Sequence, residues 1–239
     1  MNYYQKIAGY YDALMESGYY DHAKLAQTVH SVIGSGKKVL EIGVGTGKMV
    51  EELAAIDPSS DFCGVDFSGA MIEIANRRLS NRFPMVECDI STMELDQTFD
   101  VVLSCGGAWI VQKSDEGLCL GTHLFSPDKD RLGFEKVSKH LETGGRLVLS
   151  VHPPHTDRQL EMDNGMVYSQ KVGDYQGGTD HFYLEKTYSF LQGDETLAEE
   201  TMTLGFYKEN IFQPMFTGAG FKPLGLTETE EFFVFEKVA

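Results

Sequence analysis

The sequence predicts an α/β fold in which parallel strands are joined by crossover helices. From residue 37, short β-branched runs alternate with longer helical patterns, as parallel strands and their connections require. After residue 152, apolar and polar residues alternate one by one, which is typical of half-buried antiparallel strands. We therefore expect one domain over residues 1–239, with a helical lid at residues 1–30 and an antiparallel β insertion at residues 153–205.

Five strands and three helices are predicted in the first part of the chain. The strands are Lys38–Ile42, Phe62–Asp66, Met85–Cys88, Asp100–Cys105 and Arg146–His152, and the helices are Lys48–Ala55, Gly69–Ser80 and Pro127–Leu141. The third helix has the clearest boundaries, because Ser126 can cap its start and Gly144 follows its end. We expect a loop between the fourth strand and this helix.

The later part is expected to add an antiparallel layer, a helix and two strands. Phe182, Leu184, Tyr188 and Phe190 alternate with polar residues, as do Met202, Leu204 and Phe206, and a third strand is expected at Met166–Val172. The connection is too long to be structureless, since bare loops beyond ~15 residues are uncommon. The helix Lys208–Thr217 and strands Lys222–Leu226 and Phe232–Glu236 follow. The tyrosine-rich N-terminus either packs on the sheet or covers a ligand.

The acidic composition of the chain argues against two classes of binding partner, nucleic acids and membranes. The formal charge is 20 − 36 = −16, and a chain this acidic repels phosphate backbones and anionic lipids, so we expect neither a nucleic-acid nor a membrane partner. The four cysteines form no CxxC, which favours reduced core thiols. With no signal-peptide pattern and no long apolar run, the sequence predicts a soluble, cytoplasmic protein of unknown oligomeric state.

A glycine-rich turn at Gly43, Gly45 and Gly47 follows the first strand and precedes a helix. Such turns let a ligand approach the main chain and offer free N–H groups to it. A P-loop is excluded because Ile42 occupies its first glycine position and Met49 replaces its Ser/Thr. A dinucleotide fingerprint fails because Lys48 stands where it needs Gly or Ala.

The pattern E-x-G-x-G-x-G, from Glu41 to Gly47, resembles motif I of the class I S-adenosylmethionine-dependent methyltransferases. The resemblance covers about residues 38–152 and implies a Rossmann-like, seven-stranded sheet with helices on both faces and S-adenosylmethionine as cofactor. It also implies that Glu41 helps to hold the cofactor's amino-acid part, directly or through water, and that Gly43, Gly45 and Gly47 bind the cofactor. An acid at this position suits an ammonium and a sulfonium but would repel a pyrophosphate.

Two further motifs imply the remaining cofactor contacts. The resemblance assigns Asp66, next to Phe67, to the ribose hydroxyls; the alternative is that Asp66 caps the following helix, which Ser68 could do instead. It assigns Asp89 to the adenine amino group and Ile90 to one side of the ring. Met71 either faces the other side of the adenine or is a core methionine.

The reacting centre is expected beyond the fourth and fifth strands, where ligands bind in open parallel sheets. The resemblance places the main chain near Ser104 beside the cofactor's methionine part. His123 and His152 are candidate general bases, although a lone histidine is more often a packing residue. Tyr11 is the residue expected nearest the cofactor. We expect no metal, since His152 and His155 alone do not make a site.

These features predict methyl transfer to the nitrogen or oxygen of a small-molecule metabolite. The fourth strand lacks the [DN]-P-P-[YFW] motif of nucleic-acid amino-methyltransferases. The layout, with its Tyr10-Tyr11-Asp12 segment, is similar to that of glycine N-methyltransferases and amino-sugar N,N-dimethyltransferases. Two alternatives stay open: an inactive cofactor-binding partner or regulator, and a nicotinamide dehydrogenase, against which Lys48 argues.

Overall fold

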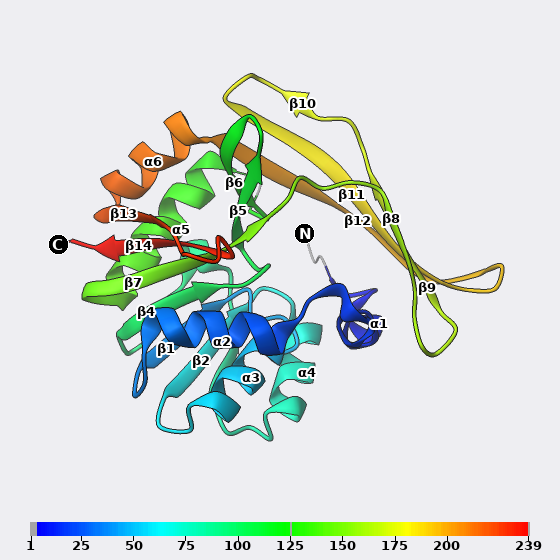
Figure 1. Ribbon diagram of the computed structural model, residues 1–239, viewed down its shortest axis with the longest axis horizontal. Helices are drawn as coiled ribbons and strands as arrows, with labels where there is room; N and C mark the ends of the chain where they lie inside the picture. Colours follow the sequence, from blue (N-terminus) through cyan, green and yellow to red (C-terminus); the bar gives the residue numbers. More distant parts are fainter. Residues whose placement is uncertain (1–3, 125, 239) are drawn as a thin grey trace.

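One continuous 14-stranded sheet organises the computed structural model, which describes residues 4–124 and 126–238 (Figure 1). One part of it, which we call the parallel part because most of its strands run parallel, comprises β1 (Lys38–Ile42), β2 (Asp61–Asp66), β3 (Met85–Glu87), β4 (Phe99–Ser104), β7 (Leu141–His152), β13 (Phe221–Leu226) and β14 (Phe232–Lys237). The order is β3-β2-β1-β4-β7, and β14 pairs antiparallel with both β7 and β13. The predicted Rossmann-like fold is confirmed, but the sheet has 14 strands rather than the predicted seven.

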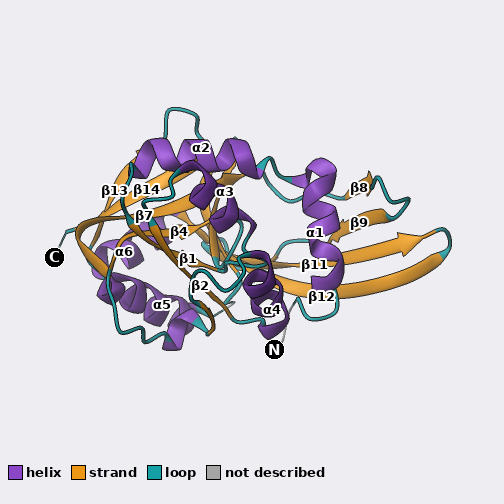
Figure 2. Cartoon of the chain, turned by 90° about the horizontal axis from the view of Figure 1, so that it is seen from below, coloured by secondary structure: helices purple, strands orange, loops and turns teal. Residues whose placement is uncertain are grey.

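Helices cover both faces of this parallel part (Figure 2). One face carries α2 (His22–Ile33), α3 (Lys48–Ile56) and α4 (Gly69–Arg78), and the other carries α5 (Pro127–His140) and α6 (Glu209–Gly218). Val39 lies in the buried cluster formed with α2 and α3, whereas its neighbour Leu40 lies in the cluster formed with α5 and α6. Because both faces are buried, the central strands are nearly continuous apolar runs.

A β-hairpin occupies the segment between β4 and α5, where we expected a loop, so that expectation is wrong. β5 (Trp109–Ser114) runs parallel to the end of β7, and β6 (Gly117–Thr122) returns antiparallel to β5. The buried Asp130 carboxylate holds the hairpin by accepting hydrogen bonds from Trp109 Nε1 at 2.7 Å and Thr122 Oγ1 at 2.6 Å. Tyr207 OH donates a third hydrogen bond at 2.8 Å.

The antiparallel insertion is confirmed as a set of antiparallel strands but continues the main sheet. Its strands are β8 (Arg158–Glu161), β9 (Val167–Val172), β10 (Gln176–Gly177), β11 (His181–Gln192) and β12 (Glu195–Lys208). β12 pairs with β6, so the insertion is joined edge to edge with the rest. The long β11–β12 hairpin projects away from the parallel part (Figure 1). β8 and β10 were not predicted, because both are short and largely exposed.

The N-terminal segment, residues 4–20, packs against this insertion. It forms α1 (Ala8–Leu14) and the π-helical turn η1 (Met15–Tyr19), and α1 lies beside the β11–β12 hairpin (Figure 2). Leu14 and Met15 share a buried cluster with Tyr168 and Phe190 of the insertion. Tyr10 stacks on Phe190 with ring centroids 5.4 Å apart. Some of the N-terminal tyrosines therefore pack against the sheet, which was one of the two roles considered for them from the sequence.

All four cysteines are free thiols, with Cys63 buried and the other three partly buried. Within the described ranges, no helix combines the length and the apolar character that crossing a bilayer requires. The described residues also hold no group of three or more histidines, cysteines or carboxylates arranged to bind a metal ion.

The turns that follow β1 and β4 approach each other main chain to main chain. A Cβ added to Gly107 would lie 2.5 Å from Ile42 O and 2.7 Å from Gly43 O. A Cβ added to Gly43 would lie 2.6 Å from Ala108 N, and Gly43 also has a φ of +68°. Two glycines are therefore needed for the two turns to touch.

We expect Gly107→Ala to lower the free energy of unfolding by ~1–3 kcal/mol, the usual cost of forcing extra volume into a packed site. The matched control is Gly218→Ala, because a methyl group at Gly218 meets nothing within 4 Å. Denaturant unfolding of both variants measures the difference. Equal stability of Gly107→Ala and the unmodified protein would show that the two turns can separate without cost.

Candidate active site

The glycine-rich turn is anchored to the end of β2. Gly43 N and Val44 N both donate hydrogen bonds to Val65 O, at 2.8 and 3.0 Å. Gly45 N donates to Asp66 Oδ2 at 2.9 Å. The turn therefore keeps its shape through the strand that carries the second predicted motif, and Asp66 is part of that link.

A cavity of about 290 Å³ lies at the carboxyl ends of the parallel strands. Its lining includes seven of the ten residues assigned to the cofactor by resemblance: Gly43, Gly45, Asp66, Phe67, Met71, Asp89 and Ile90. Tyr4 and Tyr11 of the N-terminal segment and the main chain of residues 106–108 line it as well. The structure thus brings the three sequence motifs to one concave site, which we call the large cavity.

Asp66 is buried at the wall of the large cavity, with 7% of its surface exposed. Its Oδ1 accepts a hydrogen bond from Ser68 N at 2.9 Å. Burial raises the pKa of Asp66, although the main-chain donors of Ser68 and Gly45 oppose the shift. Each carboxylate oxygen keeps a second lone pair, so the side chain can still accept hydrogen bonds from a ligand.

Asp89 holds a more exposed position at the same cavity and has a cationic partner. Its Oδ2 lies 2.8 Å from Lys129 Nζ, and its Oδ1 accepts from Ser91 N at 2.9 Å. Partial burial alone would raise the pKa of Asp89, but the hydrogen bonds from Lys129 and Ser91 lower it overall. Neighbouring Ile90 and Met71 are buried and supply apolar surface.

Three predicted cofactor residues do not line the large cavity. Gly47 packs against α4, where an added Cβ would lie 3.2 Å from the Ala75 side chain. Ser104 is buried and its Oγ accepts a hydrogen bond from Trp109 N at 3.2 Å. Glu41 is 2% exposed, burial raises its pKa, and its Oε2 has no hydrogen-bond partner among the described residues.

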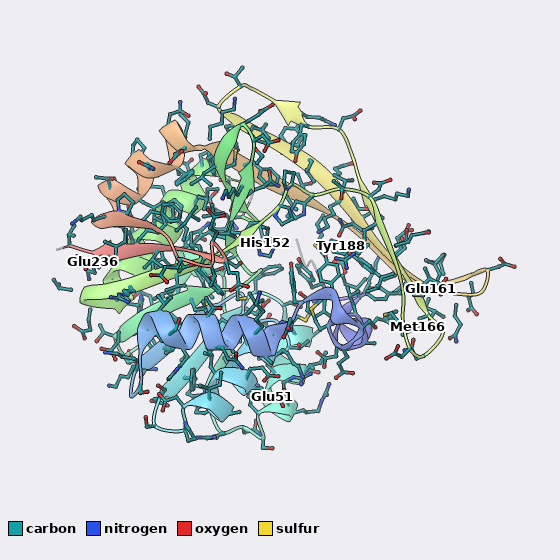
Figure 3. All side chains as sticks on the ribbon, in the orientation of Figure 1. Glu51, His152, Glu161, Met166, Tyr188 and Glu236 are labelled. Carbon is teal, nitrogen blue, oxygen red and sulfur yellow. The ribbon has the colours of Figure 1, made fainter. Side chains whose placement is uncertain are left out.

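A second, smaller cavity of about 40 Å³ adjoins the first. Both cavities are lined by Tyr4, Tyr11, Gly106 and His123, so these four residues form the boundary between them. The small cavity is also lined by Tyr19, Tyr20, His152, His155, Lys186 and Tyr188. His152 and Tyr188 mark its place between the parallel sheet and the insertion in Figure 3.

His123 follows β6 and faces both cavities. Its Nε2 lies 3.2 Å from Tyr4 OH, and its buried Nδ1 has no hydrogen-bond partner among the described residues. Burial, with a smaller effect from Lys186, lowers the pKa of His123 to about 4. The imidazole is therefore neutral at physiological pH and able to accept a proton.

His152, at the end of β7, is more fully engaged. Its Nε2 lies 2.8 Å from Ser150 Oγ, which also accepts a hydrogen bond from Gly106 N at 2.9 Å. Ser150 Oγ therefore contacts both His152 and the main chain of the turn after β4, while His152 Nδ1 lies 3.5 Å from Tyr20 OH. Burial lowers the pKa of His152 to about 4. His152 thus connects the turn after β4 to the N-terminal segment.

Lys186 is the residue that our reasoning from sequence missed. It lies in β11 on the same face as Leu184 and Tyr188 and is 4% exposed. The other residues of that face from Phe182 to Phe190 are apolar or aromatic. Burial lowers its pKa to about 7. A single lysine at a core position of an alternating strand was the signal that could have identified it.

Arg78, in the last turn of α4, connects the N-terminal segment to the glycine-rich turn. Its Nη2 lies 2.6 Å from Asp12 Oδ2, and its Nη1 lies 2.8 Å from Glu51 Oε2. Its Nε donates to Thr46 O, in the turn itself, at 3.0 Å. The Arg78 guanidinium therefore links the N-terminal segment to the glycine-rich turn on the other side of the large cavity.

Comparison with known families matches residues 39–145 to a model described as a methyltransferase domain. The matched stretch runs from β1 into β7 and so contains the glycine-rich turn, Asp66 and Asp89. This match confirms the resemblance that the motif at residues 41–47 indicated.

Two curated relatives differ in how much of the chain they match. Malonyl-[acyl-carrier protein] O-methyltransferase of Bacillus anthracis is 35% identical over 71 residues, or 29% of this chain and 26% of that protein. The chain thus matches about a quarter of the length of that relative. Demethylmenaquinone methyltransferase of Chlamydia pneumoniae is 29% identical over 192 residues, or 76% of each protein.

Solved structures match almost the whole chain. DesVI of Streptomyces venezuelae has a TM-score of 0.70 at 17% identity and covers 96% of this chain and 97% of its own. CalS10 of Micromonospora echinaspora, an amino pentose methyltransferase solved with S-adenosylmethionine bound, has a TM-score of 0.64 at 18% identity, with 95% and 96% covered. At 17–18% sequence identity, the structural similarity shows that this chain has the same fold as these two proteins.

We expect Asp12→Asn to loosen the N-terminal segment, because it removes the charge that Arg78 contacts. Partly exposed ion pairs contribute up to about 1 kcal/mol, so amide exchange in α1 should quicken by roughly two- to fivefold while global stability changes little. Glu16→Gln is the control, since Glu16 is exposed in the same segment. Unchanged exchange in Asp12→Asn would show that the Arg78 contact does not hold this segment.

Proposed function

We propose that this chain, which carries a methyltransferase domain at residues 39–145 on the fold of S-adenosylmethionine-dependent methyltransferases, methylates a nitrogen or oxygen of a small molecule. One observation carries the proposal: the large and small cavities meet at Tyr4, Tyr11, Gly106 and His123. A donor in the first and an acceptor in the second would have their reactive groups at this boundary.

The residues of the large cavity fit S-adenosylmethionine. Asp66 would accept hydrogen bonds from the ribose hydroxyls, and Asp89 would accept one from the adenine amino group, with Ile90 and Met71 as apolar flanks. The unpartnered Glu41 Oε2 supplies a buried acid near the turn, as an ammonium-bearing ligand requires. When bound, the cofactor supplies a methyl group activated by its sulfonium.

His123 is the proposed proton acceptor for the attacking nitrogen or oxygen. It borders both cavities, is neutral, and has one ring nitrogen without a partner among the described residues. His152 is the weaker candidate, because its Nε2 is already hydrogen-bonded to Ser150 Oγ. A positioned base typically contributes 10²–10⁴-fold to a rate.

Alignment and exclusion of water would supply the larger part of the acceleration. Holding two reactants in a productive geometry can contribute roughly 7–11 kcal/mol. Tyr4 and Tyr11 come from the N-terminal segment and Tyr188 from the insertion, so the boundary is enclosed by aromatic side chains from both. A cavity of about 40 Å³ suits a small acceptor group rather than a polymer.

We expect Asp66→Ala to weaken binding of S-adenosylmethionine at least tenfold. Hydrogen bonds to a charged group are worth about 1.5–3 kcal/mol, and the variant also removes the acceptor of Gly45 N. Isothermal titration calorimetry measures the change, with Asp96→Ala as an exposed-carboxylate control. Unchanged affinity in Asp66→Ala would remove this residue from the binding site.

We expect His123→Ala to lower kcat by 10²-fold or more, with cofactor affinity retained. The assay follows label from S-adenosylmethionine into a panel of metabolite acceptors, and His30→Ala is the control. His123 must be neutral to accept a proton, and its pKa is about 4. In the unmodified protein, kcat/KM should therefore fall on the acidic side only near pH 4, rather than near the pH of 6.5 at which an ordinary histidine titrates. Near-native turnover of His123→Ala would mean that catalysis proceeds by positioning alone.

A further inference from the structure

We propose that the small cavity recognises a carboxylate group of the acceptor and that Lys186 is its cationic partner. The inference deepens the proposed function, on which it rests, by naming a chemical class for the acceptor: a small molecule with a carboxylate beside the amine or hydroxyl to be methylated. It starts from a buried amine and the composition of the groups around it.

Lys186 is a buried amine without an anionic partner among the described residues. Its Nζ lies 3.5 Å from His155 Nδ1 and 4.7 Å from the centroid of the Tyr188 ring. Among residues 4–124 and 126–238, no carboxylate forms an ion pair with it. Glu200, a buried acid on the adjacent strand, accepts a hydrogen bond from the main-chain nitrogen of Lys6 instead. Burying an unpaired charge is costly, so a ligand anion would supply the missing partner.

The other groups at the small cavity are neutral donors and acceptors. Burial lowers the pKa of His152 to about 4 and that of His155 to about 2, with Lys186 adding to both shifts. His155 Nε2 is buried with no hydrogen-bond partner among the described residues. Tyr11, Tyr19, Tyr20 and Tyr188 also line the cavity, and burial raises the pKa of each. No acid lines the cavity among the described residues, so nothing there repels an anion.

The arrangement favours a carboxylate over a phosphate. Phosphate sites usually offer a guanidinium fork or the N–H groups of a helix N-terminus, and the described lining of this cavity offers one ammonium instead. Arg158, whose charge contributes to the lowered pKa of Lys186, lies over the Tyr19 ring at 4.7 Å. One cation in a cavity of about 40 Å³ matches a compact, singly charged group.

The test compares acetate with acetamide, two probes of similar shape that differ in charge. NMR of imidazole-labelled protein follows the His155 resonances during titration, with S-adenosylhomocysteine present. We expect acetate to shift these resonances, acetamide to have little effect, and Lys186→Met to weaken acetate binding at least tenfold. The control is Lys171→Met, an exposed lysine paired with Asp157; Lys186→Arg should retain part of the acetate affinity because it keeps the charge.

Three outcomes would overturn the inference: equal responses to acetate and acetamide, acetate binding that persists in Lys186→Met, or tighter binding of inorganic phosphate than of acetate. Folding does not confound the test, since removing an unpaired buried amine should leave stability equal or higher, which thermal unfolding checks. Calorimetric titration of S-adenosylhomocysteine separates the two proposals. If S-adenosylhomocysteine does not bind, the result counts against the proposed function. If it binds but acetate does not, the result counts against the carboxylate site alone.

Discussion

The direct contact between the turns after β1 and β4 is the constraint on which the site depends. Gly107 lies so close to Ile42 O and Gly43 O that neither turn tolerates a side chain there. This contact brings the ends of neighbouring strands together without intervening atoms. It leaves main-chain groups, rather than side chains, facing the large cavity at residues 43, 45 and 106–108. A ligand can therefore approach the backbone closely.

Acidic side chains predominate at the large cavity, and basic side chains predominate at the small cavity. The large cavity has Asp66 and Asp89 on its wall, with Lys129 paired to Asp89 and buried Glu41 nearby, whereas the small cavity has Lys186 and three histidines. Burial acts on both groups by the same physics: it raises the pKa of Asp66 and Glu41 and lowers that of Lys186 and the histidines. A cationic donor and an anionic acceptor are the pair that this division suits.

Sequence reasoning succeeded where the signal is local. The glycine-rich turn, Asp66 and Asp89 each follow a short apolar strand, and the predicted helices begin at Lys48, Gly69 and Pro127 as found. The hairpin between β4 and α5 was missed because its anchor, Asp130, binds partners as far away as Tyr207. Long-range partners of this kind leave no periodic trace in the chain.

The residues around the small cavity could not be grouped from the sequence. His123 and His152 were proposed individually, but their proximity to Lys186 depends on β11 crossing the strand ends from far along the sequence. The Lys186 signal was present, as one lysine on an apolar face, yet only the fold gives that lysine neighbours. Likewise, the link from Arg78 to Asp12 and Thr46 joins three separate segments. Such constellations are tertiary properties.

A crystal structure of the protein with S-adenosylhomocysteine would test the central claim most directly. The account predicts density for the ligand in the large cavity, with ribose hydroxyls on Asp66, the adenine beside Asp89 and Ile90, and the sulfur directed toward the boundary at Tyr11 and His123. Ligand density elsewhere, or a sulfur atom directed away from the small cavity, would contradict it.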